Sequence, residues 1–253
     1  MLGIGVDVGG ETVKIVMLDE DKKIIKRAIF TTGFDPKDKI RETIDSFLRQ
    51  AGKTKEDARI VSTGRGRHSV DADDTIPEIP AVGKGVFFLM PTARTIVDMG
   101  GEDVRAVKLD ATGKMVDVAT SDKCAAGSGG FVATMARALE VSVPEFIELS
   151  LKASRVIPMN AQCVIFAESE VVSLIHAGVS KEDIARAIHH AMSERIAGVL
   201  NRVEVEEVVT LCGGVAKNVG LLPELKKQIK FEPVIFPETD YGAAIGAALV
   251  AFG

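Results

Sequence analysis

The chain begins with short apolar runs separated by polar turns that contain glycine, a pattern that predicts strands. Three successive strands are predicted at residues 2–8, 12–19 and 22–32. A helix follows, with Asp35 as the expected N-cap and Pro36 at the first helical position. A strand at about 59–63 then runs into the sequence Gly-Arg-Gly-Arg. The first part of the chain is therefore expected to contain three strands, a helix and a strand.

The same order of elements recurs in the second part of the chain. Three strands are predicted at residues 94–99, 103–110 and 114–120. The segment from Lys123 is predicted to become helical as far as Leu139. The later elements are mostly helical. Helices are predicted at residues 166–177, from Ser180 and from Gly242, and Ser180 with Asp183 is the start signal of the second of these. A buried strand is predicted at 208–211.

Both parts carry the same motif at the turn between their first two strands. The segment GIGVDVGGETVKIVMLD, which contains Asp7, is repeated as RTIVDMGGEDVRAVKLD, which contains Asp98, at an offset of 91 residues (98 − 7). Paired glycines let backbone amides approach a phosphate closely, and the adjacent aspartate suits a hydrated divalent cation. One copy alone is equally typical of a structural hairpin turn. Two copies in register favour nucleotide binding by two similar lobes.

The predicted fold class is α/β, with two duplicated lobes and a nucleotide cleft between them. The first lobe is placed at residues 1–93 and the second at 94–241, and the C-terminal helix at 242–253 is a candidate to pack back on the first lobe. A third glycine cluster, LCGGVAKN, follows the strand at 208–211 and could hold the nucleoside end of the ligand. With YGAAIG, which begins at Tyr241, it resembles the pattern of actin, sugar kinases and heat-shock ATPases. A Walker loop is absent from the sequence, so ATP is expected to bind in the actin-like manner.

The candidate catalytic residues are Asp7, Asp98 and Glu102, and the two aspartates are expected to hold Mg²⁺ through water. Lys14 is a candidate phosphate contact, with an ordinary strand-surface lysine as the alternative. The residues expected to bind ATP or ADP lie in or beside the glycine turns: Gly9, Gly10, Glu11, Thr12, Lys14, Gly100, Gly101, Asp103, Gly213, Gly214, Val215, Asn218 and Gly242.

Composition narrows the class of partner. The chain has 253 residues, a net charge of −5, no Trp and one Tyr, and no run of Lys or Arg. A nucleic-acid face would need clustered cations, and single-strand binding would need aromatic side chains for stacking. No apolar segment is long enough to cross a bilayer, which takes about 20 residues. We therefore expect neither a nucleic-acid partner nor a membrane partner, and a cytoplasmic location.

Two of the three cysteines precede predicted helices. Cys124 lies in DKCAAGSGGF and Cys163 lies in QCVIFAESE, and the two are 39 positions apart (163 − 124). A helix start favours thiolate over thiol because the helix dipole is positive there. Spacing alone favours small buried hydrophobic residues instead, because no C-x-x-C pair exists.

The surrounding residues resemble a known family. DKCAAGSGGF and CVIFAESEVVS, together with GRGR, IVDMGGEDV and the nucleotide loops, closely resemble the activator ATPases of 2-hydroxyacyl-CoA dehydratases over nearly the whole chain. The ATP-binding subunits of benzoyl-CoA reductases and the reductases of double-cubane cluster proteins are related to them. The resemblance implies that Cys124 and Cys163 from each of two subunits hold one [4Fe–4S] cluster in a homodimer. Four thiolates are what a cubane cluster requires.

Four positions depart from the family pattern: Gly10, Glu11, Glu102 and Cys212. Glutamate stands at position 102, where glutamine is commoner, and Gly10-Glu11 replaces a more usual Ser-Thr pair. The Glu102 carboxylate could orient or deprotonate a water, or repel the γ-phosphate unless Mg²⁺ offsets it. Cys212 lies in the third glycine cluster and is interpreted as core packing. The histidines lack metal-ligand spacing and are interpreted as surface or helix-packing residues.

The predicted function is ATP-dependent one-electron transfer to a second iron–sulfur protein. The resemblance implies ferredoxin or flavodoxin as the electron donor and a dehydratase, a benzoyl-CoA reductase or a double-cubane cluster protein as the acceptor. One rival is a small-molecule kinase of the same superfamily, which would need an acceptor pocket. A second rival is an actin-like scaffold that uses nucleotide only to set its shape. Neither rival accounts for the two cysteine motifs.

Overall fold

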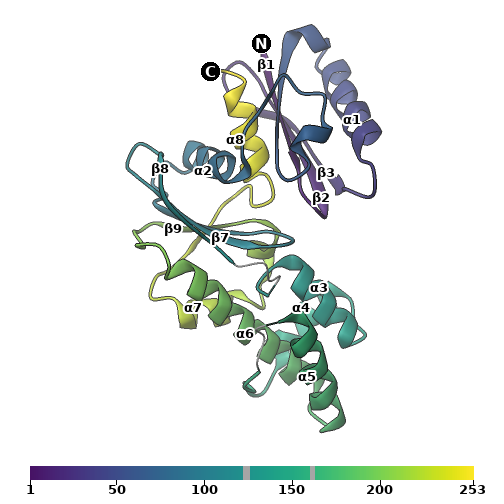
Figure 1. The fold of residues 1–253 in the computed structure, drawn as a ribbon, viewed down its shortest axis with the longest axis vertical. Helices are drawn as coiled ribbons and strands as arrows, with labels where there is room; N and C mark the ends of the chain where they lie inside the picture. The colour runs from purple at the N-terminus through teal and green to yellow at the C-terminus, as the bar shows by residue number, and fades with distance from the viewer. Residues whose placement is uncertain (122–125, 160–162) are drawn as a thin grey trace. The chain divides into compact units, whose positions relative to one another are not determined.

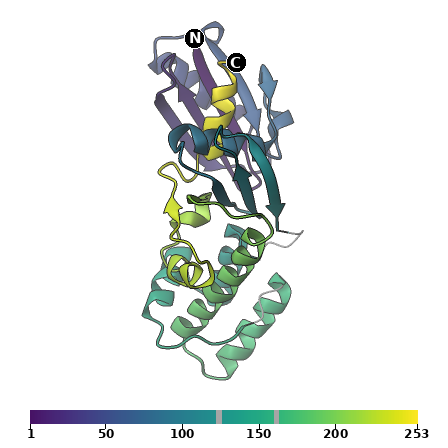
Figure 2. The ribbon, with the colours of Figure 1, turned by 90° about the vertical axis from the view of Figure 1, so that its left-hand side faces the viewer.

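The computed structural model describes residues 1–121, 126–159 and 163–253. These residues fold into two compact units (Figures 1 and 2). Unit 1 consists of Met1–Ala93, Leu109–Val116 and Phe236–Gly253, and unit 2 consists of Arg94–Lys108 and Asp117–Ile235. Both ends of the chain therefore lie in unit 1.

Unit 1 is organised around a five-stranded sheet with the strand order β3-β2-β1-β4-β5. Strand β1 is antiparallel to β2 and parallel to β4. All seven residues of β1 are buried, because helices cover both faces of the sheet at its centre. The elements are β1 (Leu2–Val8), β2 (Thr12–Leu18), β3 (Ile24–Thr31), α1 (Lys37–Gln50), η1 (Lys55–Asp57), β4 (Ala58–Thr63), η2 (Arg67–Ser69), β5 (Asp74–Thr75) and α2 (Glu78–Leu89).

The C-terminal helix α8 (Gly242–Val250) packs on the sheet of unit 1 and on α2 (Figure 1). Glycines allow this contact at backbone distance. A Cβ atom on Gly5 of β1 would lie 1.9 Å from the carbonyl oxygen of Ala244, and one on Gly246 would lie 1.8 Å from that of Ala81. Only glycine fits at these two positions, so the small residues of α8 are explained by packing.

Unit 2 contains a second sheet, in the order β10-β9-β6-β7-β8. Read from its other edge, this order repeats that of the first sheet, with β6 antiparallel to β7 and parallel to β9. The elements are β6 (Thr95–Met99), β7 (Val104–Leu109), β8 (Met115–Thr120), α3 (Gly129–Ala138), α4 (Val143–Lys152), α5 (Val164–His176), α6 (Lys181–Leu200), β9 (Val209–Cys212), η3 (Gly214–Lys217), α7 (Leu222–Gln228) and β10 (Val234–Ile235).

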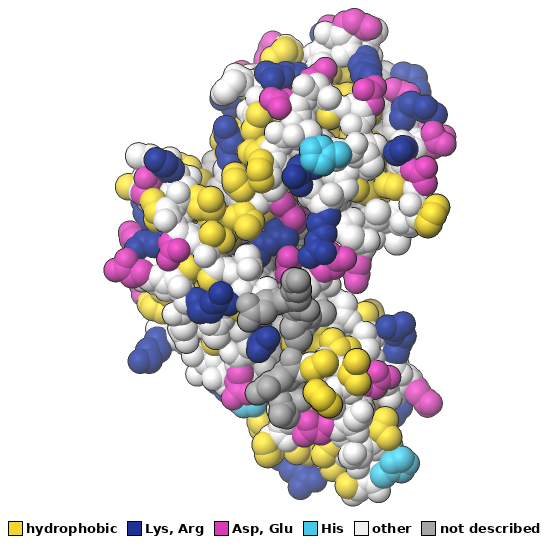
Figure 3. All heavy atoms as spheres, in the orientation of Figure 1, with side chains coloured by type: hydrophobic (Ala, Val, Ile, Leu, Met, Phe, Trp, Pro, Cys, Tyr) yellow, Lys and Arg dark blue, Asp and Glu magenta, His cyan; other side chains and the backbone are white. Residues whose placement is uncertain are grey.

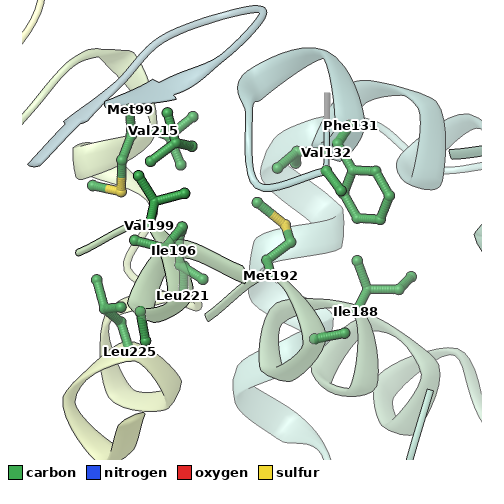
Figure 4. Close-up of a cluster of buried hydrophobic side chains, with 14 of the residues drawn as sticks. Met99, Phe131, Val132, Ile188, Met192, Ile196, Val199, Val215, Leu221 and Leu225 are labelled. Atoms are coloured by element: carbon green, nitrogen blue, oxygen red, sulfur yellow. The ribbon is translucent and has the colours of Figure 1, made fainter. Parts of the chain in front are cut away.

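Helix α6 forms the centre of the unit 2 core (Figure 4). Its Ile188, Met192 and Ile196 are fully buried, and they lie among side chains from α3, α7 and the sheet. Phe131 of α3 and Leu225 of α7 belong to the same cluster. The core therefore packs the helical part of unit 2 against the strand ends that carry the second Asp-x-Gly-Gly turn and the third glycine cluster.

Most predicted elements are confirmed, and Ser180 caps α6 by accepting a hydrogen bond from the Asp183 amide at 3.2 Å. The predicted start of α1 was wrong by one residue. Pro36 is the N-cap, and Asp35, one position before the N-cap, accepts a hydrogen bond from the Lys37 amide through its carboxylate. Helix α2 was missed because its sequence contains one proline and two glycines, which weaken a helical pattern.

Candidate functional site

The first Asp-x-Gly-Gly turn joins β1 to β2 in unit 1. Asp7 and Lys14 are paired in the sheet register, and the Lys14 Nζ lies 3.3 Å from the Asp7 carboxylate. The Gly9 amide closes the turn by donating to the Thr12 carbonyl at 3.1 Å. Gly10 and Glu11 are exposed at its tip. The turn therefore presents backbone next to a buried, cation-paired carboxylate.

The second turn, between β6 and β7 in unit 2, repeats this geometry. Asp98 and Arg105 are paired in register, with 3.6 Å between the Asp98 carboxylate and Arg105 Nη1. The Gly100 amide donates to the Asp103 carbonyl at 3.0 Å. The Asp103 carboxylate lies 3.0 Å from Arg105 Nη2, so one buried guanidinium serves two carboxylates. Glu102 is exposed at the tip of the turn.

The second turn is hydrogen-bonded to the start of α3. The Gly129 amide donates to the Gly100 carbonyl at 2.9 Å, and the Gly130 amide donates to the Gly101 carbonyl at 2.8 Å. Helix α3 follows the segment that contains Cys124, and Cys124 itself lies outside the described residues. Two backbone hydrogen bonds therefore join the second turn to the first turn of α3.

The third glycine cluster lies beside the second turn within unit 2. Gly213 has φ +83°, and a Cβ atom there would lie 2.2 Å from the Met99 carbonyl oxygen. This position therefore needs glycine for both its conformation and its space. A Cβ atom on Gly129 would lie 3.5 Å from the Gly101 Cα and 3.6 Å from Val215. The predicted residues of the second turn and of the third cluster thus meet at the start of α3.

Asn218, at the end of the third cluster, is held by a buried histidine of α6. Its Oδ1 accepts from the Gly220 and Leu221 amides, both at 3.1 Å, which leaves its Nδ2 to donate to His189 Nε2 at 2.9 Å. His189 packs edge-on against Phe146, and burial lowers the pKa of His189 to about 4. The neutral imidazole is therefore a fixed hydrogen-bond acceptor for Asn218 near neutral pH.

Two glycines of unit 1 complete the comparison with the predicted site. The first, Gly242, was predicted together with the third cluster, and the second, Gly64, was not predicted. Gly242 begins α8 and belongs to unit 1 with the first turn. Gly64, in the Gly-Arg-Gly-Arg segment, has φ +85°, and a Cβ atom there would lie 2.6 Å from Asp7 Oδ1. The signal for Gly64 was present in the sequence, because a glycine directly after a buried strand also begins the turn of the third cluster.

The described cysteines differ in environment. Cys163 is the N-cap of α5 and is partly exposed. Cys212 is buried as predicted, but its Sγ also lies 3.5 Å from Asp98 Oδ1. Within the described ranges, no three His, Cys, Asp or Glu side chains are grouped closely enough to hold a metal ion. Over the same residues, no helix has the length and apolar character needed to cross a bilayer.

Two sheets of equal strand order, each with an Asp-x-Gly-Gly turn, define a protein of the actin-like fold. The chain belongs to the BadF/BadG/BcrA/BcrD ATPase family, whose model matches residues 4–251. The predicted class of two duplicated α/β lobes and the resemblance to dehydratase activators are thereby confirmed.

Relatives of known role are similar over nearly their whole length. The activator of lactoyl-CoA dehydratase from Anaerotignum propionicum is 38% identical, with 100% of this chain and 98% of the relative covered. The (R)-2-hydroxyglutaryl-CoA dehydratase activating ATPase of Acidaminococcus fermentans is 35% identical, with 98% and 96% covered. A benzoyl-CoA reductase subunit of Thauera aromatica is 30% identical, with 97% and 91% covered.

Solved structures agree with this assignment. The activator of 2-hydroxyisocaproyl-CoA dehydratase from Clostridium difficile, determined with bound ADPNP, superposes with a TM-score of 0.91 at 34% identity and covers 100% of this chain and 94% of its own. A ROK family glucokinase from Streptomyces griseus, in complex with glucose and AMPPNP, has a TM-score of 0.60 at 14% identity over 100% of this chain and 99% of its own. The likeness to the glucokinase shows the fold alone.

Proposed function

We propose that this protein is an ATPase that passes single electrons to a partner iron–sulfur enzyme. The acceptor is a 2-hydroxyacyl-CoA dehydratase, a benzoyl-CoA reductase or a double-cubane cluster protein. The names of relatives at 30–38% identity support the first two. Ferredoxin or flavodoxin as the donor, and a cytoplasmic location, rest on the resemblance in the cysteine motifs.

In this proposal, ATP binds through the glycine turns and Mg²⁺ binds through water held by Asp7 and Asp98. The backbone of Gly9 and Gly10 and that of Gly100 and Gly101 contact phosphates, and the third cluster contacts the nucleoside. The buried aspartates and their adjacent cations suit a metal-bound polyphosphate. ADPNP in the structure of a relative supports a nucleotide at this family's site.

The observation that carries the proposal is the hydrogen bonding between the second turn and α3. The carbonyls of Gly100 and Gly101 accept from the first two amides of α3, the helix that follows the Cys124 motif. The phosphate contacts of that turn differ between ATP and ADP. A change in the turn therefore moves α3, which is the kind of differential contact that couples a ligand to a distant group.

The residues described around Cys163 fit a shared [4Fe–4S] cluster. Cys163 is partly exposed at the N-terminus of α5, so its sulfur can reach beyond its own chain. Ile165 and Phe166 follow it and are 71% and 70% exposed, and other hydrophobic side chains lie at the surface of this unit (Figure 3). An apolar face next to a cluster ligand suits coverage by a second subunit.

Ligand count then requires two chains. Each chain offers Cys124 and Cys163, and the cluster needs four thiolates. When bound, the cluster would supply a site that accepts and releases one electron. The protein's part is to hold the thiolates, exclude water with the apolar face of α5 and adjust α3 to the nucleotide state.

Iron content tests the dimeric cluster. After strictly anaerobic purification, we expect about four iron atoms per dimer, and a loss of iron and colour in Cys163→Ser. Cys212→Ser is the matched control, because Cys212 is buried beside Asp98 and should leave the iron content at the wild-type value. An iron-free wild-type protein with full ATPase activity would reject the proposal.

The coupling through α3 has its own test. Gly129→Pro removes the amide that donates to the Gly100 carbonyl but remains compatible with the first turn of a helix. Gly129→Ala keeps this amide, and the space around its Cβ atom is sufficient. We expect the electron paramagnetic resonance spectrum of the reduced cluster to respond to Mg·ATP in the wild type and in Gly129→Ala, and to lose that response in Gly129→Pro. An unchanged response in Gly129→Pro would contradict the route through α3.

A further inference from the structure

The strand next to each aspartate ends in the same way in both sheets. In unit 1, Thr63 is the last residue of β4 and is paired with Asp7 in the register. In unit 2, Cys212 is the last residue of β9 and is paired with Asp98. Each is followed by a glycine of positive φ, +85° and +83°. Thr63 and Cys212 therefore occupy equivalent positions, although their sequences share only the following glycine.

Register partners on neighbouring strands point to the same side of a sheet. In unit 2 this places the Cys212 Sγ 3.5 Å from Asp98 Oδ1. The Cys212 thiol therefore donates an S–H hydrogen bond to this carboxylate.

Thr63 has the corresponding position but differs from Cys212 in its hydrogen bonding. Its Oγ1 is buried and, among the residues that the structure describes, has no hydrogen-bond partner. A buried hydroxyl without a partner destabilises a fold, so Thr63 Oγ1 would gain from an acceptor within reach. The Asp7 carboxylate is turned toward this strand end, because its Oδ1 would lie 2.6 Å from a Cβ atom on Gly64. Hydrogen bonds at functional sites are often long in the unliganded protein and shorten when the ligand binds.

We propose that Thr63 and Cys212 are equivalent positioning residues, one in each lobe, that orient Asp7 and Asp98 toward the waters of the nucleotide-bound Mg²⁺. Cys212 donates to Asp98 already in the unliganded protein, and Thr63 donates to Asp7 when Mg·nucleotide binds. This inference rests on the proposed function and adds to it two residues outside the glycine turns. It also gives Cys212 a role beyond core packing.

The test compares substitutions that remove the donor at each position with substitutions that keep one. Thr63→Val and Cys212→Ala remove the donor, whereas Thr63→Ser and Cys212→Ser retain one. Thr210→Val is the matched control, because Thr210 Oγ1 is also buried without a partner among the described residues but lies beside Ile96 in the register, two residues before Cys212. The measurements are ATPase activity of the anaerobic holoenzyme during a Mg²⁺ titration, and thermal unfolding of the nucleotide-free protein.

Loss of a hydrogen bond to a charged group corresponds to about a tenfold change in an equilibrium constant. We therefore expect Thr63→Val and Cys212→Ala each to raise the Mg²⁺ concentration for half-maximal activity about tenfold, with a smaller change in kcat. Both serine variants should recover most of that affinity, and Thr210→Val should titrate like the wild type. Thr63→Val should unfold at the same temperature as the wild type or higher, because it removes an unsatisfied hydroxyl.

Two outcomes would overturn the inference. One is a wild-type Mg²⁺ titration in both Thr63→Val and Cys212→Ala, and the other is an equal shift in Thr210→Val. The proposed function fails separately, if calorimetry shows that the wild-type protein does not bind Mg·ADP. A lower unfolding temperature in Thr63→Val together with an unchanged Mg²⁺ titration would mark Thr63 as structural only.

Discussion

The two Asp-x-Gly-Gly turns have the same backbone and different attachments. In both turns the first glycine amide donates to a carbonyl three residues later, and the aspartate is paired in register with a cation. The Gly9 carbonyl accepts from the Thr32 hydroxyl at 2.8 Å, and Thr32 directly follows β3 of the same sheet. The equivalent Gly100 carbonyl accepts from the Gly129 amide of α3.

This difference in attachment suggests that the two turns have different tasks. The first turn is fixed to its own sheet through Thr32. The second turn is bonded to a helix that leads from a cysteine motif. We infer that the first lobe mainly holds the nucleotide and that the second lobe responds to it. The predictions below test where the two lobes are equivalent and where they differ.

The largest effect is expected where the lobes are equivalent. Gly64→Ala and Gly213→Ala each place a Cβ atom at a positive φ and within 2.5 Å of a backbone oxygen, that of Val8 or of Met99. Backbone strain and overpacking together should lower the free energy of unfolding by about 4 kcal/mol in each variant. Urea denaturation measures this loss.

Gly100→Ala is the control for these two variants. The nearest atom to its Cβ would be the Asp103 carbonyl oxygen at 3.5 Å, an ordinary contact. Its stability should stay within about 1 kcal/mol of the wild type. A large loss for Gly213→Ala and a small one for Gly64→Ala would show that the two strand ends are not equivalent.

The cations beside the two aspartates should contribute unequally to the free energy of unfolding. Arg105 is buried and contacts both Asp98 and Asp103, so Arg105→Ala leaves two carboxylates without this partner and should cost about 3 kcal/mol. The Lys14 side chain is 19% exposed and contacts Asp7, so Lys14→Ala should cost about 1 kcal/mol. Denaturant midpoints measure both costs.

Arg105→Lys refines the same comparison. It keeps the positive charge but cannot contact two carboxylates with a planar fork, so its stability should lie between those of the wild type and Arg105→Ala. Equal losses for Lys14→Ala and Arg105→Ala would contradict the idea that the second turn is the more strongly tied of the two.

The helical part of unit 2 contains a buried base that makes its stability depend on pH. Burial lowers the pKa of His189 from 6.5 to about 4, so between these values the unfolded chain binds a proton that the folded chain does not. Stability should therefore fall as the pH is lowered from about 6.5 to about 4, by about 2–3 kcal/mol, and this contribution should level off below pH 4.

The variant His189→Phe isolates that contribution. Its stability at pH 8 should be lower, because Asn218 loses its acceptor, but its decline between pH 6.5 and 4 should be shallower than that of the wild type. His68→Asn, which changes a histidine of unit 1 that is not buried, is the control and should follow the wild-type curve. Parallel curves for the wild type and His189→Phe would show that His189 does not titrate in this range.

Sequence patterns predicted the strands and the duplication well, because both depend on local features. The buried central strand β1 alternates Leu, Ile and Val with glycine and one aspartate, and the Asp-x-Gly-Gly turn recurs at a fixed offset. The equivalence of Gly64 and Gly213 was missed because helices α3 to α6 are inserted between β8 and β9. The two glycines are therefore not separated by the 91-residue offset that relates the Asp-x-Gly-Gly turns.

Contacts between residues far apart in the chain also could not be predicted from the sequence. The bonds from α3 to the second turn, the His189–Asn218 pair and the Cys212–Asp98 contact join residues 29 or more positions apart, and they depend on how helices and strands pack. Nothing in the local sequence distinguishes His189 from its neighbour His190, which is only partly buried. Burial alone decides that one imidazole is a fixed acceptor.

The smallest expected effect lies at the second hairpin turn of each lobe. Lys22 and Gly113 occupy equivalent positions at the same 91-residue offset (113 − 22), after Asp19 and Asp110, and both have positive φ, 60° and 82°. A lysine in this conformation costs about 1 kcal/mol relative to glycine. Its Nζ also lies 5.8 Å from the Phe252 ring centre, a contact worth about 0.5 kcal/mol at an exposed site.

Lys22→Gly should therefore stabilise the protein by about 0.5 kcal/mol, the difference between relieved strain and the lost ring contact. The reverse change in the second turn, Gly113→Lys, should destabilise it by more than that, because a Cβ atom there would lie 2.3 Å from the Phe87 ring. Thermal unfolding measures both changes. A Lys22→Gly variant less stable than the wild type would show that the contact with Phe252 outweighs the strain, and that the two turns are equivalent in backbone but not in energy.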